Sequence, residues 1–67
     1  MVTVDARGLS CPEPVMLMLD AIAQESGPVT VVVDNATARD NVAHMAEERG
    51  RKVTVAAEGS DFRLLLK

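Results

Sequence analysis

Residues 29–34 read Val-Thr-Val-Val-Val-Asp, and this run constrains the fold more than any other part of the sequence. β-branched residues favour strands, and Pro28 marks where the run starts. The three consecutive valines from Val31 to Val33 make the strand apolar on both faces, which is typical of a strand inside a sheet. We therefore expect a central strand over Val29–Asp34, with the other elements packed around it.

Two helices are predicted, one before and one after this strand. Their apolar positions repeat with helical spacing. These positions are Val15, Met18, Leu19 and Ile22 in the first helix, predicted over residues 12–25, and Ala38, Val42, Met45 and Ala46 in the second. The start of the second helix is open between Asn35 as the N-cap and a capping box from Thr37 to Asp40. Gly50 is a suitable residue for its end.

Alternating apolar and polar residues predict three further strands, over residues 2–5, 52–57 and 62–67. The short connection that contains Gly59 makes the last two an antiparallel hairpin. The element order is then βαβαββ, and right-handed crossovers place both helices on one face of the sheet. The sequence predicts an α+β fold, a single domain over residues 1–67 built as a two-layer α/β sandwich.

The only cysteine of the 67 residues lies where the first helix begins. Proline suits the first helical position, so Pro12 is predicted as the first residue of the helix and Cys11 as its N-cap. The positive end of a helix favours a thiolate, which makes Cys11 the candidate nucleophile. Pro12 and Pro14 have no N–H, so the amides of Glu13 and Val15 are expected to face the sulfur.

Residues close to Cys11 in the sequence supply a candidate surface for a partner protein. Arg7 would favour the thiolate if the loop folds back, whereas the Glu13 carboxylate opposes it. Met16 and Leu17 fall outside the buried stripe and are predicted to be exposed apolar contacts. The predicted partner-binding residues are Arg7, Pro12, Glu13, Pro14, Met16 and Leu17.

Three other residues are predicted to support the site. Asp5 and Asp34 end two strands at one edge of the sheet, where α/β folds usually place their sites. We expect both aspartates to order the loop by capping its amides rather than to catalyse. Gly8 allows a turn in that loop that other residues would resist.

Composition argues against several classes of function. Aromatic residues make up 1% of the chain and the net charge is −3, which disfavours base stacking and phosphate tracking, so no nucleic-acid partner is expected. No metal site is predicted, because one cysteine and one histidine lie far apart in the sequence. The lone cysteine and the lack of a signal or membrane-length apolar run favour the cytoplasm, with no membrane partner.

The stretch around the cysteine resembles the signature of the TusA-type sulfur carriers, also called the SirA-like family. The residues that carry the resemblance are Asp5, Arg7, Gly8, Leu9, Cys11, Pro12, Glu13 and Pro14. Residues 33–40 and the closing hairpin also resemble this family, and the step from Asp34 to Asn35 and the hairpin are most similar to its YedF-like branch. The resemblance covers essentially the whole chain. It implies a mixed four-stranded sheet in the spatial order 1-2-4-3, with the last strand antiparallel.

The resemblance also implies a function. Cys11 would accept sulfane sulfur as a persulfide from a cysteine desulfurase or rhodanese-like donor and pass it to an acceptor protein. Such relays feed tRNA thiolation, molybdenum-cofactor chemistry or sulfur oxidation, with a selenium connection in the YedF-like branch. The chain would be a sulfurtransferase-type carrier with no cofactor beyond the covalent persulfide sulfur. The alternatives are a non-catalytic protein-interaction module and a thiol redox-regulatory module.

Overall fold

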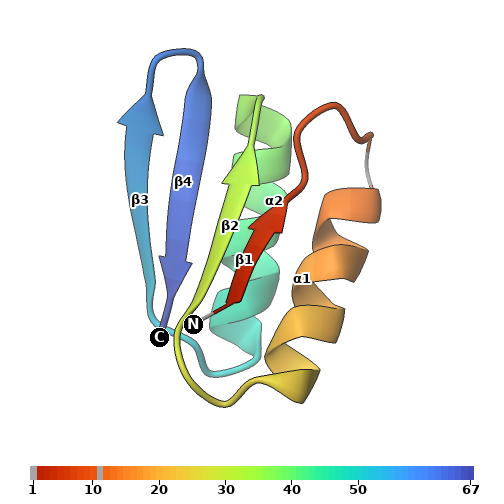
Figure 1. Ribbon diagram of the computed structural model, residues 1–67, viewed down its shortest axis with the longest axis vertical. Helices are drawn as coiled ribbons and strands as arrows, with labels where there is room; N and C mark the ends of the chain where they lie inside the picture. Colours follow the sequence, from red (N-terminus) through yellow and green to blue (C-terminus); the bar gives the residue numbers. More distant parts are fainter. Residues whose placement is uncertain (1, 11) are drawn as a thin grey trace.

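The computed structural model describes residues 2–10 and 12–67. Its elements are β1 (Val2–Asp5), α1 (Glu13–Gln24), β2 (Val29–Val33), α2 (Ala36–Glu48), β3 (Val53–Glu58) and β4 (Asp61–Leu66). The predicted order βαβαββ is confirmed. So is the two-layer arrangement, in which a four-stranded sheet packs against both helices (Figure 1).

The sheet is mixed, and β2 lies inside it. The strand order is β1-β2-β4-β3, with β1 parallel to β2 and the other two pairings antiparallel. Val29 is opposite Val2 on one side and Leu66 on the other. The prediction of a central strand and the implied spatial order are therefore both confirmed.

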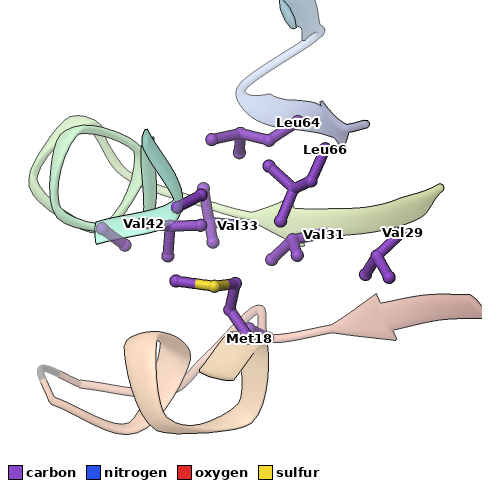
Figure 2. Packing of buried hydrophobic residues seen from close by; sticks show 10 residues of the cluster. Met18, Val29, Val31, Val33, Val42, Leu64 and Leu66 are labelled. Carbon is purple, nitrogen blue, oxygen red and sulfur yellow. The ribbon is translucent and has the colours of Figure 1, made fainter. Parts of the chain in front are cut away.

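The core lies between the β2 valines and the two helices. Val29, Val31 and Val33 have no exposed surface, and neither do Met18 of α1 and Val42 of α2. Figure 2 shows Met18 reaching toward the β2 valines, with Leu64 and Leu66 of β4 lying beside them. The predicted stripe of α1 faces this core, with Met18 fully buried and the other members partly buried around it. Aliphatic side chains thus build the core.

β3 is the least covered strand. It forms one edge of the sheet, and every residue after Val53 is exposed. Val55 points toward the helix side of the sheet, yet 43% of its surface is exposed. α2 reaches β3 and Val53 packs against the core, but the rest of this strand stays exposed.

The start of α1 differs from the prediction by one residue. Pro12 is the N-cap, with φ −100° and ψ 16°, and the helix begins at Glu13. The reason is a turn in which the Glu13 amide donates to the Ser10 carbonyl at 2.9 Å, so helical geometry begins after Pro12. Pro12 thus takes the N-cap position assigned to Cys11, which itself lies outside the described residues.

The start of α2 follows one of the two predicted alternatives. Asn35 is the N-cap, and its side-chain oxygen accepts a hydrogen bond from the Ala38 amide at 2.7 Å. This bond satisfies one of the amides that a helix start leaves without an intrahelical partner. The competing capping box from Thr37 is therefore wrong.

The end of the sheet at which β1 and β2 finish lies opposite the chain termini. β1 and β2 end at the same edge as the turn between β3 and β4, whereas Val2 and Lys67 lie at the other end (Figure 1). We call the first end the rim, formed by residues 5–10 and 12, Asp34 and residues 58–61. Within the described residues, neither helix is long and apolar enough to cross a membrane.

Replacing Met18 with alanine should destabilise the protein strongly. The Met18 side chain is fully buried, so Met18→Ala leaves a cavity and should lower the free energy of unfolding by about 2–5 kcal/mol. Urea unfolding followed by circular dichroism measures the change. Met16→Ala is the matched control, because Met16 lies on the same helix but is 58% exposed. Equal losses in the two variants would contradict the assigned core.

Candidate functional site

The loop that leads to Cys11 stays attached to the sheet after β1 ends. The amide of Ala6 donates to the Val32 carbonyl at 2.8 Å, and the Ala6 side chain is buried. The chain then turns at Gly8, whose φ of +79° is a conformation that side chains disfavour. No heavy atom lies within 4 Å of a Cβ placed there, so backbone conformation, not crowding, favours glycine.

Arg7 connects this loop to two carboxylates of the rim. Its Nε and Nη2 donate to the two oxygens of Asp5, each at 2.9 Å, and its Nη1 lies 3.3 Å from Oδ2 of Asp61. The Arg7 amide also donates to Asp5 at 3.1 Å. The side-chain bonds from Arg7, and then its amide, lower the pKa of Asp5 to about 2. The same carboxylates raise the pKa of Arg7.

Asp34 holds the loop from the end of β2. Its Oδ2 accepts a hydrogen bond from the Gly8 amide at 2.7 Å, and its Oδ1 accepts one from the Asn35 side chain at 3.1 Å. The Gly8 bond, and then the Asn35 bond, lower the pKa of Asp34. Asn35 caps α2, so this chain of contacts joins the loop, β2 and α2. Asp5 and Asp34 both accept loop amides, which is the supporting role proposed for them.

The first turn of α1 offers few free amides. Glu13 donates to Ser10 and Met16 donates to the Pro12 carbonyl at 3.0 Å, while the prolines have no N–H. The carbonyl that the Val15 amide would meet in helical geometry belongs to residue 11, which lies outside the described residues. The Glu13 amide, which was predicted to face the sulfur, donates to the Ser10 carbonyl, and the position of the sulfur lies outside the described residues.

The predicted partner-binding residues divide into exposed and buried ones. Met16 and Leu17 are 58% and 39% exposed, and Pro12, Glu13 and Arg7 are exposed as well. Pro14 is fully buried, which differs from its predicted place on a partner surface. It precedes Met18 by one helical turn and faces the core with it. Pro14 therefore shapes the start of α1 from inside and offers no direct contact.

Cys11, the predicted nucleophile, lies outside the described residues. Its neighbours Ser10 and Pro12 are both exposed. Around them the rim carries the carboxylates of Asp5, Asp34 and Asp61 against the single guanidinium of Arg7, so this surface is acidic. The site thus places the predicted nucleophile, in the sequence, directly after a loop held by charged hydrogen bonds.

Sequence reasoning missed Asp61. It lies 54 residues after Arg7, and only the hairpin topology brings the two together. The strand order could have indicated this contact, because it places the turn between the last two strands, and with it the acidic Asp61, at the same end of the sheet as Arg7.

Known proteins share both the sequence pattern and the fold. The profile of the family described as sulfurtransferase TusA matches residues 2–67. The crystal structure of a SirA-like protein from Desulfitobacterium hafniense resembles the chain with a TM-score of 0.91 and 34% identity, covering 98% of this chain and 95% of that one. Similarity to the YedF-like branch stays a prediction.

The pairing of Arg7 with Asp5 should be visible in an acid titration. Because the pKa of folded Asp5 is lowered from 3.8 to about 2, its stabilising effect is present above pH 3.8 and lost as the pH falls toward 2. In Arg7→Gln, the pKa of Asp5 should rise from about 2 toward 3.8 but stay below it, because the amide of residue 7 still donates to the carboxylate; the side-chain carbon resonance of Asp5 measures the change. Arg49→Gln, which removes the same charge beyond the end of α2, should leave the midpoint unchanged. An unshifted midpoint in Arg7→Gln would rule out this pairing.

Proposed function

The chain belongs to the TusA, or SirA-like, sulfurtransferase family, and on this premise we propose that it carries sulfane sulfur as a persulfide on Cys11 and passes it to an acceptor protein. The observation that carries the proposal is the position of the lone cysteine. Cys11 lies between two exposed residues, at the junction of the ordered rim loop and α1. Membership of the family supports sulfur transfer in general. The position of Cys11 supports this residue as the one that carries the transferred sulfur.

Each step of the proposed transfer is an exchange at sulfur. The Cys11 thiolate attacks the terminal sulfur of a donor persulfide, a new S–S bond forms at Sγ, and the donor cysteine leaves as a thiolate. The transferred sulfur keeps its proton, so Cys11–S–SH results. An acceptor thiolate then attacks that terminal sulfur, and Cys11 returns to the thiolate. Sulfur is neither gained nor lost in the cycle, and no external oxidant or reductant is consumed.

The local structure supports a reactive thiolate through the helix and not chiefly through Arg7. The N-cap residue Pro12 makes no side-chain capping hydrogen bond at the positive end of α1, where a thiolate is favoured. Arg7 was expected to help the thiolate, but its charge lies between Asp5 and Asp61. We propose that Arg7 acts mainly by ordering the loop that precedes Cys11.

The exposed residues of α1 supply a surface for docking. Pro12, Glu13, Met16 and Leu17 lie within two turns of Cys11 in the sequence, and the two apolar side chains are large. Methionine adapts its shape, which suits a surface that must bind first a donor and then an acceptor. We propose a cysteine desulfurase or rhodanese-like protein as donor, acting in the cytoplasm, where reducing conditions keep the thiol available.

Intact mass spectrometry tests the proposal directly. After incubation with a cysteine desulfurase and free cysteine, the protein should gain the mass of one sulfur atom, and a reductant should reverse the gain. Cys11→Ser should gain nothing. A gain in Cys11→Ser would remove Cys11 from the mechanism. Peroxide oxidation of Cys11 without sulfur uptake from desulfurase or rhodanese donors would instead select a redox-regulatory module.

The docking role of α1 can be separated from the chemistry of Cys11. Leu17→Asp places a charge on the apolar contact and should slow sulfur loading from the desulfurase about tenfold, as for loss of one interface anchor. Alkylation of Cys11 by iodoacetamide should keep its rate, because the thiol itself is unchanged. Ala23→Asp is the control, with the same charge at the other, exposed end of α1. Loading at the unaltered rate in Leu17→Asp would show that Leu17 does not contact the donor.

A further inference from the structure

The free edge of β3 presents hydrogen-bonding groups that its own sheet does not use. Lys52 and Lys67 exchange two backbone hydrogen bonds, of 3.0 and 2.8 Å. Hydrogen-bonded pairs alternate along antiparallel strands, so Thr54, Ala56 and Glu58 also bond to β4. It follows that Val53, Val55 and Ala57 direct their N–H and C=O groups away from β4, toward the open side.

This edge lacks the features that usually prevent pairing with another strand. Residues 53–57 contain no proline and no charge, and the β3·β4 register runs without a bulge. Their side chains are small, and those from Thr54 to Ala57 are exposed. The opposite edge strand, β1, has only four residues and leads directly into the rim loop. β3 is therefore the edge open to a further strand.

We propose that β3 pairs antiparallel with β3 of a second copy of this chain, across a two-fold axis at Val55. Val55 then lies opposite Val55 of the second copy, and Val53 lies opposite Ala57. Each of these pairs joins residues whose backbone groups face outward, so each exchanges two hydrogen bonds. The two four-stranded sheets become one continuous sheet.

Charge complementarity selects this register and this partner. With Val55 at the axis, Lys52 lies opposite Glu58 of the second copy, and the two-fold axis repeats this pair at the other end of the strand. Both side chains are exposed and share the face away from the helices. Arg63 donates to Oε2 of Glu58 at 3.0 Å, which holds the carboxylate on that face. Moving the axis by two residues in either direction breaks both charge pairs.

The pairing also covers the apolar surface that the helices leave open. In this register, odd-numbered residues of β3 lie opposite odd-numbered residues of the second copy. Opposite residues point to the same face of the sheet, so the helices of both copies lie on one side of the joined sheet. The two Val55 side chains, each 43% exposed in the single chain, then contact one another. Because the axis is perpendicular to the sheet, the two rims point in opposite directions, and Glu58 is the one rim residue that the pairing uses. The inference is therefore independent of the proposed sulfur transfer.

A charge-swap experiment tests the register. In sedimentation velocity from micromolar to millimolar protein, the wild-type chain should show a monomer–dimer equilibrium that weakens with added salt. Lys52→Glu and Glu58→Lys each place like charges opposite each other and should weaken dimerisation roughly tenfold. An equimolar mixture of the two variants restores both opposite-charge pairs and should dimerise again. Lys67→Glu, which changes the same charge just after β4 at the position opposite Lys52, should dimerise like the wild type.

A backbone variant tests the hydrogen bonds. Val55→Pro removes an N–H that β4 does not use, so the fold should survive while the central pair of bonds is lost. Circular dichroism checks the fold, and sedimentation should show only monomer. A wild-type chain that stays monomeric at millimolar concentration overturns the proposal. This holds also if β3 is found to bind a peptide of another protein instead. Failure of the mixture to restore dimers would overturn the register.

Discussion

Burial of the β2 valines is the constraint on which the rest of the structure depends. The chain has no tryptophan or tyrosine, so its core must come from aliphatic side chains packed around one strand. Val29, Val31 and Val33 face both helices and are fully buried, while β1 and β4 pair with β2 on either side. Side chains alternate along strands, so a shift of one residue would expose all three valines. This requirement holds the strands in the one register that brings Asp5, Asp34 and the β3–β4 turn to the same end.

In this register, residues of the rim hold a short loop that has few buried side chains. Of the described residues between β1 and the start of α1, only Ala6 is fully buried, and Leu9 packs against the core partly buried. The remaining order comes from ionic hydrogen bonds, with Arg7 between two aspartates and the Gly8 amide on Asp34. Each of these contacts is exposed to solvent and individually weak. Together they connect the loop to β1, β2 and the hairpin, so the approach to α1 is restrained from three directions.

The sequence was sufficient for the fold, because long stretches have a clear period of two or 3.6 residues. It was less reliable where two positions satisfy the same rule. Pro12 and Pro14 both suit a helix start, and only the Ser10–Glu13 turn determines that Pro12 is the N-cap. Pro14 is buried because of the orientation of α1 about its own axis relative to the sheet. The spacing of one helical turn between Pro14 and the buried Met18 indicated this orientation.

The contact between Arg7 and Asp61 could not be found from local patterns at all. It joins residues separated by nearly the whole chain, so it follows from the order of strands rather than from neighbouring residues. In contrast, the role of Asn35 was predictable, since helix caps depend on residues only three positions apart. Of these two contacts, the one between residues close in the sequence was predictable and the one between distant residues was not.

The placement of both chain ends opposite the rim has a consequence for attachment. Val2 and Leu66 share a row of the sheet with Val29 between them, so both ends leave the molecule at one place (Figure 1). A tag, a surface linker or a fused domain joined at either end would extend away from the loop that carries Cys11. Tethering the chain at its termini would therefore leave the rim accessible to other proteins.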